Sequence, residues 1–215
     1  KEYYELGARF AKWRAVISIS ENLPSHQCIK SNAHALARYA SLCQANNIVP
    51  IVEPEILMDG HHTIHDSFVT TEKTLAMVFD ELRLQNVLLE GIVLKPNMVL
   101  SGYNCDEQAS VKKVAQLTVE VFKRTVPVSV PGIAFLSGGQ SDELATAHLN
   151  EMNKSFGSSC PWNLTYSYGR ALQAPALKAW GGDDKKIDLA QKAFYKRASL
   201  NSLATKGEYS QGMEG

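Results

Sequence analysis

The sequence lacks the features that mark several classes of protein. It has only four cysteines and no C-x-x-C pair, which argues against a zinc site or a disulfide framework and favours reduced thiols in the cytosol. Lys and Arg (22) balance Asp and Glu (22), so overall charge gives no reason to expect nucleic-acid binding. No apolar run approaches the roughly 20 residues that span a bilayer. Neither G-x-G-x-x-G nor G-x-S-x-G occurs, so a dinucleotide fold and a serine-hydrolase elbow are not expected.

What is present is a regular alternation of short apolar runs and longer amphipathic stretches. Five runs are β-branched or continuously apolar, as parallel strands buried on both faces are. They are Ala15–Ile19, Ile48–Ile56, Val87–Leu94, Gly132–Leu136 and Leu164–Tyr168. The stretches with helical periodicity are Asn32–Gln44, Thr63–Arg83, Glu107–Arg124, Glu143–Lys154, Ala171–Trp180 and Asp184–Thr205, the last with Asp184 as its expected N-cap.

This repeat suits either a doubly wound α/β sheet or a (β/α)8 TIM barrel. Polar residues favour the barrel, because they gather where strands end and loops begin, which is where barrels place their chemistry. Five strands do not close a barrel, and about three further units of roughly 30 residues are needed. We therefore expect residues 1–215 to be the C-terminal portion of a single barrel domain, covering about its last five βα units.

Lys95 ends the third apolar run, in Leu94-Lys95-Pro96. A buried ammonium is costly unless it is paired or neutralised, and a second cation nearby favours the neutral amine. A neutral lysine can attack a carbonyl and form a Schiff base. The alternative is a lysine that extends from the barrel rim into solvent.

Glu53 and Glu55 alternate along one strand, so both side chains point to the same face. Two carboxylates in a confined space separate into an acid and a base at neutral pH. Lys12 and Arg14 are likewise one residue apart, just ahead of or early in the first strand. They would supply the second cation and an anion ligand, or else form ordinary ion pairs with the glutamates.

Residues 137–141, Ser-Gly-Gly-Gln-Ser, separate an apolar strand from a helix. Glycines let backbone N–H groups approach an anion, and a helix N-terminus adds its dipole. The last strand adds Ser167 and Arg170, and the arginine can hold a phosphate with two parallel hydrogen bonds. Two such loops on consecutive strands predict a phosphate site, although a Gly-Gly pair alone is more often a tight turn.

Three histidines, His61, His62 and His65, have spacing that could bind a metal. They follow Asp59-Gly60, a turn signal, and lead into an expected helix. Because no histidine lies at the predicted catalytic strand ends, a solvated loop is the favoured interpretation.

Taken together, the sequence resembles class I fructose-bisphosphate aldolase, a Schiff-base lyase on a (β/α)8 barrel. The resemblance covers nearly the whole chain and rests on long, ordered segments. They are GARFAKWR (7–14), VPIVEPEIL (49–57), LLEGIVLKPNM (88–98), VPGIAFLSGGQS (130–141) and PWNLTYSYGRALQ (161–173).

The resemblance implies a metal-independent and cofactor-independent glycolytic and gluconeogenic enzyme that reversibly cleaves fructose 1,6-bisphosphate. Lys95 would be the Schiff-base lysine and Glu53 the acid/base group. Glu55 and Lys12 would support the protonation state and the transition-state charge.

The implied phosphate contacts come from three parts of the chain. Ser137, Gly138 and Gly139 would hold one substrate phosphate, with Ser167 and Arg170 also binding substrate. Arg14 would contact the other phosphate. The family also implies a cytoplasmic homotetramer, known binding to cytoskeletal proteins, and no membrane or nucleic-acid partner.

Two departures keep alternatives open. First, the family has a catalytic aspartate on the first strand and a lysine on the third, and these have no counterpart in this sequence. Second, animal members of the family end in a tyrosine that has no counterpart in this sequence either. A non-catalytic, partner-binding fragment is one alternative. Another is a Schiff-base aldolase that prefers a different sugar phosphate, such as sedoheptulose bisphosphate.

Overall fold

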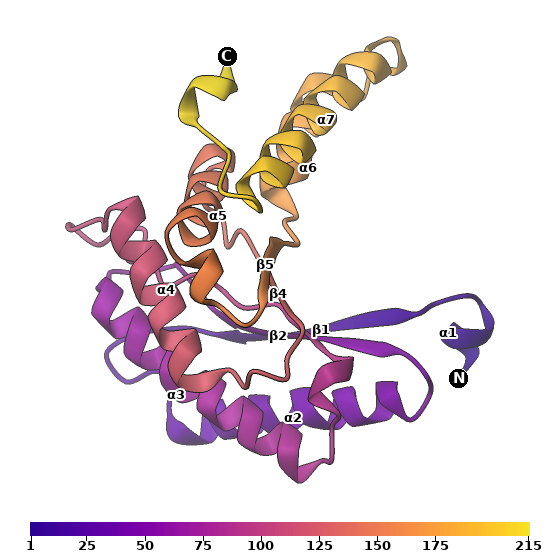
Figure 1. Cartoon of the computed structure of the whole chain (residues 1–215), viewed down its shortest axis with the longest axis vertical. Coiled ribbons are helices and arrows are strands. Elements are labelled where there is room, and N and C mark those ends of the chain that lie inside the picture. The colour runs from indigo at the N-terminus through magenta and orange to yellow at the C-terminus, as the bar shows by residue number, and fades with distance from the viewer.

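The computed structural model describes all 215 residues and contains one parallel sheet (Figure 1). Its five strands lie side by side in chain order. They are β1 (Phe10–Ile17), β2 (Val49–Ile56), β3 (Val93–Leu94), β4 (Gly132–Phe135) and β5 (Asn163–Tyr166). Every neighbouring pair is parallel. Sequential parallel strands joined by helices are the pattern of consecutive barrel units, so the expected fold class is confirmed for the part of a barrel that five strands form.

Helices connect the strands and pack on one another in chain order. They are α1 (Glu2–Glu5), α2 (His26–Gln44), α3 (Ile64–Leu84), α4 (Val111–Thr125), α5 (Asp142–Phe156), α6 (Arg170–Trp180) and α7 (Ile187–Ala204). Helices α2 to α5 form a series of neighbouring pairs, and α6 and α7 form a hairpin that extends away from the sheet in Figure 1. None of the helices combines the length and the apolar character that a membrane crossing requires.

Local capping explains where the connecting helices begin. Ser25, Ser110 and Ser141 each accept a hydrogen bond from a backbone N–H in the first turn of α2, α4 and α5. Thr63 and Asp66 form a reciprocal capping box at the start of α3. With these caps, α2 begins at His26, earlier than the expected Asn32, and α4 begins at Val111, later than the expected Glu107.

The two faces of β1 have different environments. Ala15 and Ile17 are buried on the side of α2, where Trp13 packs against Tyr39 with ring centroids 5.8 Å apart. Lys12, Arg14 and Val16 alternate with them and are exposed. The face that carries the charged side chains of β1 is therefore open.

Three further expectations about the bounds of elements were wrong. The first strand begins at Phe10, not Ala15, because charged residues alternating with apolar ones hide a strand whose second face is open. Val87–Leu94 is mostly not a strand, since a 3-10 turn at Leu89–Gly91 precedes the two-residue β3. Asp184 does not cap the last helix: Asp183 caps a short 3-10 turn, and α7 begins at Ile187.

Candidate active site

The C-terminal end of β3 is fixed to β2 by a buried network centred on Asn97. Its side-chain oxygen accepts a hydrogen bond from the Ile56 N–H at 3.0 Å, and its nitrogen donates to Thr71 Oγ1 at 3.2 Å. The Lys95 N–H donates to the Val52 carbonyl at 2.8 Å. Since backbone and side chain both connect the two strands, Lys95 has a defined position relative to the glutamates of β2.

Glu53 lies between two lysines. One carboxylate oxygen is 3.4 Å from Lys95 Nζ and the other is 3.1 Å from Lys12 Nζ. The Glu53 side chain is only 4% exposed and that of Lys95 13%, whereas Lys12 is 43% exposed. The oxygen facing Lys12 has no aligned hydrogen bond despite this distance. The carboxylate is therefore held by charge, and this oxygen has hydrogen-bonding capacity left.

Arg14 and Glu55 form the second pair between β1 and β2. The Arg14 Nε donates to a Glu55 oxygen, and this hydrogen bond is the main reason why the pKa of Arg14 lies above its ordinary value. The terminal nitrogens of Arg14 make no hydrogen bond within the protein, and its side chain is 45% exposed. Arg14 can therefore hold Glu55 and still offer N–H groups to an anion.

The Ser137–Gly139 loop forms a cradle of backbone donors. Gly138 and Gly139 have φ values of +60° and +91°, which other residues rarely adopt. The N–H groups of Ser137, Gly138 and Gly139 donate to no protein acceptor. Free N–H groups in such a turn, next to the N-terminus of α5, form an anion-binding concavity.

The loop after β5 lies against this cradle. The Ser167 N–H donates to the Phe135 carbonyl at 2.8 Å, which ties the ends of β4 and β5 together. Arg170, the first residue of α6, has a terminal nitrogen 3.1 Å from the position that a Cβ on Gly139 would occupy. No side chain caps α6, and the N–H groups of Arg170 and Ala171 donate to no protein acceptor.

Tyr103 is a site residue that sequence reasoning missed. It lies in the loop after β3, and its hydroxyl donates to the Gly138 carbonyl at 3.1 Å. Burial raises the pKa of Tyr103, Arg170 opposes this, and Asp59 and Glu55 add to it. Its only signal in the sequence was its place in the loop that follows Lys95. Because the loop path decides where its ring lies, periodicity could not find it.

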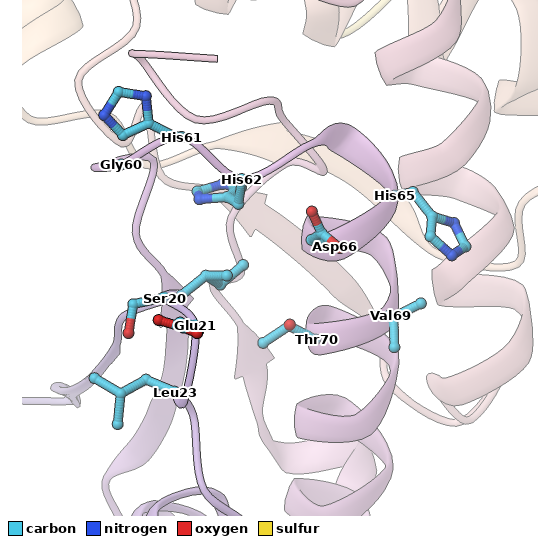
Figure 2. A pocket seen from close by; sticks show the side chains of 11 residues that line it. Ser20, Glu21, Leu23, Gly60, His61, His62, His65, Asp66, Val69 and Thr70 are labelled. Atoms are coloured by element: carbon cyan, nitrogen blue, oxygen red, sulfur yellow. The ribbon is translucent and has the colours of Figure 1, made fainter.

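A cavity lies away from these residues, between the loops after β1 and β2 and the start of α3. Its volume is about 730 Å³, and none of the predicted site residues lines it. Figure 2 shows His61 and His65 at opposite ends with His62 between them. Burial lowers the pKa of His62, and no group of three potential ligands is placed to hold a metal. The three imidazoles therefore do not converge on one point.

Comparisons with known proteins agree on one family. The family model described as fructose-bisphosphate aldolase class-I matches residues 1–215. A probable class 1 fructose-bisphosphate aldolase of Xanthomonas campestris is 56% identical over 210 residues, covering 97% of this chain and 62% of the relative. Fructose-bisphosphate aldolase 4, cytosolic, of Arabidopsis thaliana is 54% identical, covering 97% and 53%.

Solved structures agree with the sequence relatives. A fructose-bisphosphate aldolase from Plasmodium falciparum, solved in complex with TRAP and a small-molecule inhibitor, superposes with a TM-score of 0.96. It is 50% identical, and the match covers 99% of this chain and 61% of that one. The chain thus spans about three fifths of the length of the relatives it matches.

Proposed function

Because the chain belongs to the class I fructose-bisphosphate aldolase family, we propose that the protein reversibly cleaves fructose 1,6-bisphosphate to dihydroxyacetone phosphate and glyceraldehyde 3-phosphate. The observation that carries the proposal is the Lys12–Glu53–Lys95 arrangement at the strand ends. It places a nearly buried amine within 3.4 Å of a nearly buried carboxylate, and a second cation on the same carboxylate. Imine chemistry at neutral pH uses a desolvated lysine, a second cation nearby and a group that transfers protons, and these three residues are candidates for those roles.

The reaction proceeds through a covalent intermediate on Lys95. The amine attacks the C2 ketone, and the carbinolamine loses water when Glu53 supplies a proton to the departing hydroxyl. The C3–C4 electron pair then moves into the protonated imine, while carboxylate Glu53 accepts the C4 hydroxyl proton and the aldehyde leaves. Protonation of the resulting enamine at C3 and hydrolysis of the imine release dihydroxyacetone phosphate and restore Lys95.

The remaining predicted residues have roles that their positions support. Lys12 would stabilise negative charge that develops on the substrate oxygens, and Glu55 would hold Arg14 in place to receive one phosphate. The Ser137–Gly139 loop with Arg170 would receive the other phosphate, and Ser167 borders the same cradle. With this division of roles, positive charge or N–H groups would meet each end of a bisphosphate.

The sheet itself supports a larger domain. Strands β1 and β5 each have an unpaired edge, and closing a (β/α)8 barrel takes three more strands. We propose that residues 1–215 form the C-terminal portion of such a domain and that its other units complete the site. The intact mass of the protein tests this: a mass above 23.7 kDa that corresponds to about 100–150 additional residues would support the larger domain. A species near 23.7 kDa would instead favour a non-catalytic, partner-binding role.

Borohydride trapping tests the chemistry. Full-length protein treated with dihydroxyacetone phosphate and borohydride should carry a single label on Lys95, read by peptide mass spectrometry. Lys95→Met should abolish labelling. Lys73, an exposed lysine of α3 without an ion pair, gives the matched control Lys73→Met, which should label normally. A label on another lysine would overturn the assignment, and kinetics with sedoheptulose bisphosphate would test substrate preference.

We also propose that the protein assembles as a homotetramer in the cytoplasm and binds cytoskeletal proteins. All four cysteines are free, which suits a reducing compartment, and one relative is named as cytosolic. Light scattering should give four subunit masses at micromolar concentration. A monomer mass would contradict the assembly, and failure to co-sediment with actin filaments would argue against that partner.

A further inference from the structure

A buried chain of side chains lies beneath the Ser137–Gly139 loop. His148, on α5, contacts Gln140 with 2.6 Å between its Nδ1 and the Gln140 Oε1. The Gln140 Nε2 in turn donates to the Ser137 carbonyl at 2.9 Å. His148 is 1% exposed and Gln140 6%, so water does not compete for these bonds. The chain connects the helix to the carbonyl at which the loop begins.

The direction of each hydrogen bond follows from the atoms. A carbonyl only accepts, so the Gln140 nitrogen faces Ser137 and the Gln140 oxygen faces His148. That oxygen also only accepts, so the proton is on His148 Nδ1. Burial lowers the pKa of His148 to about 4, and the ring is therefore neutral at physiological pH. Its Nε2 is left as a buried acceptor without a partner.

This chain shapes the loop. The Ser137 carbonyl accepts two hydrogen bonds, from the Gln140 N–H at 3.1 Å and from its side chain at 2.9 Å. Both close the turn that holds Gly138 and Gly139 at positive φ and leaves their N–H groups free. The Ser137 carbonyl sets which end of the Gln140 amide faces it, and the His148 Nδ1–H satisfies the opposite, buried end. Without that donor the Gln140 oxygen would be buried and unpaired, and the amide would be held from one side only.

We propose that His148 is a positioning residue for the phosphate of the ketose substrate, acting through Gln140 on the Ser137–Gly139 loop. The inference rests on the proposed function of that loop as a phosphate site. The Leu136 N–H donates to the Pro96 carbonyl at 3.1 Å, so this loop begins beside the residue that follows Lys95. It is therefore suited to the phosphate one carbon away from the imine.

A role in packing alone does not account for His148. An apolar side chain would fill the same space without leaving a nitrogen unpaired, and burying an unsatisfied acceptor costs stability. The imidazole lies where its other nitrogen, Nδ1, donates to the Gln140 oxygen. The choice of residue is explained if the donor at Nδ1 is what the site requires.

Two substitutions separate the donor from the volume. His148→Asn keeps an N–H that can reach the Gln140 oxygen, whereas His148→Leu fills the space without a donor. In the full-length protein, we would measure borohydride trapping at Lys95 against concentration for dihydroxyacetone phosphate and for dihydroxyacetone. We expect His148→Leu to raise half-saturation about tenfold for the phosphate ester only, the loss of roughly one hydrogen bond. His148→Asn should stay within about twofold of the wild type.

Several outcomes would overturn the proposal. One is a His148→Leu protein that loses affinity equally for both ketones. Another is a His148→Leu protein with unchanged affinity for the phosphate ester. The third is a His148→Asn protein that loses as much affinity for the phosphate ester as His148→Leu does. If His148→Leu does not fold, Gln140→Met removes the hydrogen bond to His148 and also the one to the Ser137 carbonyl, and it should show a phosphate-selective loss at least as large. A loss of affinity that is equal for both ketones would contradict the proposal. Wild-type protein that traps neither ketone would refute the proposed function itself, which is a distinguishable result.

Discussion

Two clusters of charged side chains can be compared: Lys12, Glu53 and Lys95 at the strand ends, and Arg197 with Glu214 near the C-terminus. Both pair a carboxylate with cations, but they differ in how many hydrogen bonds the carboxylate accepts. Between β1, β2 and β3, Glu53 meets two lysines without an aligned hydrogen bond to the oxygen facing Lys12. At the other cluster, Arg197 of α7 donates to both Glu214 oxygens, at 2.8 and 2.6 Å. Its other terminal nitrogen donates to the Asp142 carbonyl and to Thr146 Oγ1.

The comparison shows how one interaction type serves two purposes. In the Arg197 cluster one guanidinium nitrogen contacts both Glu214 oxygens, and the Tyr209 hydroxyl also donates to Glu214 at 2.9 Å, so its charges are fixed in place. At the strand ends the partners are fewer and Lys12 is half-exposed, so a substrate can replace or join them. The Glu53 oxygen that faces Lys12 therefore has hydrogen-bonding capacity left for a substrate hydroxyl, whereas both Glu214 oxygens already accept hydrogen bonds.

The largest expected effect comes from Glu53→Gln, which keeps the shape of the side chain and removes its charge. We expect kcat to fall about 10²–10⁴-fold, because the amide cannot exchange a proton. The free energy of unfolding should fall by about 1–3 kcal/mol, since nearly buried Lys95 loses an ionic partner but the amide oxygen can still accept a hydrogen bond from either lysine. Steady-state kinetics measures kcat, and urea unfolding measures the free energy of unfolding.

As a control, Glu120→Gln removes a surface ion pair of α4 and should change neither kcat nor stability. An unchanged kcat in Glu53→Gln would show that Glu53 has no catalytic role.

Arg197→Met should give the opposite result. It leaves Glu214 without its buried partner, and we expect the free energy of unfolding to fall by about 3–5 kcal/mol. Imine trapping at Lys95 should persist below the unfolding transition, because Arg197 contacts none of the strand-end residues. Urea unfolding and trapping on the same sample measure both. If stability fell by less than about 1 kcal/mol, the Arg197 cluster would not be the structural counterpart that its geometry indicates.

Lys12→Met sharpens the comparison within the strand ends. It removes one of the two ammoniums on Glu53 and should lower kcat about 10²–10³-fold, because a preorganised positive charge near the developing oxyanion is lost. Lys95 should remain labelled after borohydride treatment, in contrast to Lys95→Met. Unchanged turnover would leave Lys12 as an ordinary ion-pair partner, the alternative that its sequence position allowed.

The smallest effect concerns pH and the Arg197 cluster. Burial, and then the hydrogen bond to Glu214, raises the pKa of Tyr209 to about 12, above the value near 10 of an unfolded tyrosine. Its contribution to stability is present below pH 10 and is lost as pH rises towards 12. We expect a loss of about 2 kcal/mol across this range in the wild type and less in Tyr209→Phe, measured by urea unfolding. Parallel pH profiles for the two proteins would contradict this coupling.

Parts of the fold and of the site could be predicted because they depend on residues close in the sequence. Strands β4 and β5 lie within two residues of their expected bounds, since each is a short apolar run between turn signals. The long third apolar run gave the wrong element. Gln44, on α2, holds both the N–H and the carbonyl of Leu88 with its side chain, and this contact between distant residues favours a turn before β3.

The features of the site also separate into those that depend on nearby residues and those that depend on distant ones. The sequence by itself determined that a lysine ends a buried strand, that two glutamates share a face and that glycines open a loop, because period and turn chemistry are local properties. Only the tertiary structure decided that Glu53 faces both Lys12 and Lys95, that Tyr103 reaches Gly138, and that His148 lies behind Gln140. These pairs are joined through strand register, loop path and helix rotation, which are set by packing across the whole sheet and cannot be read from any one segment.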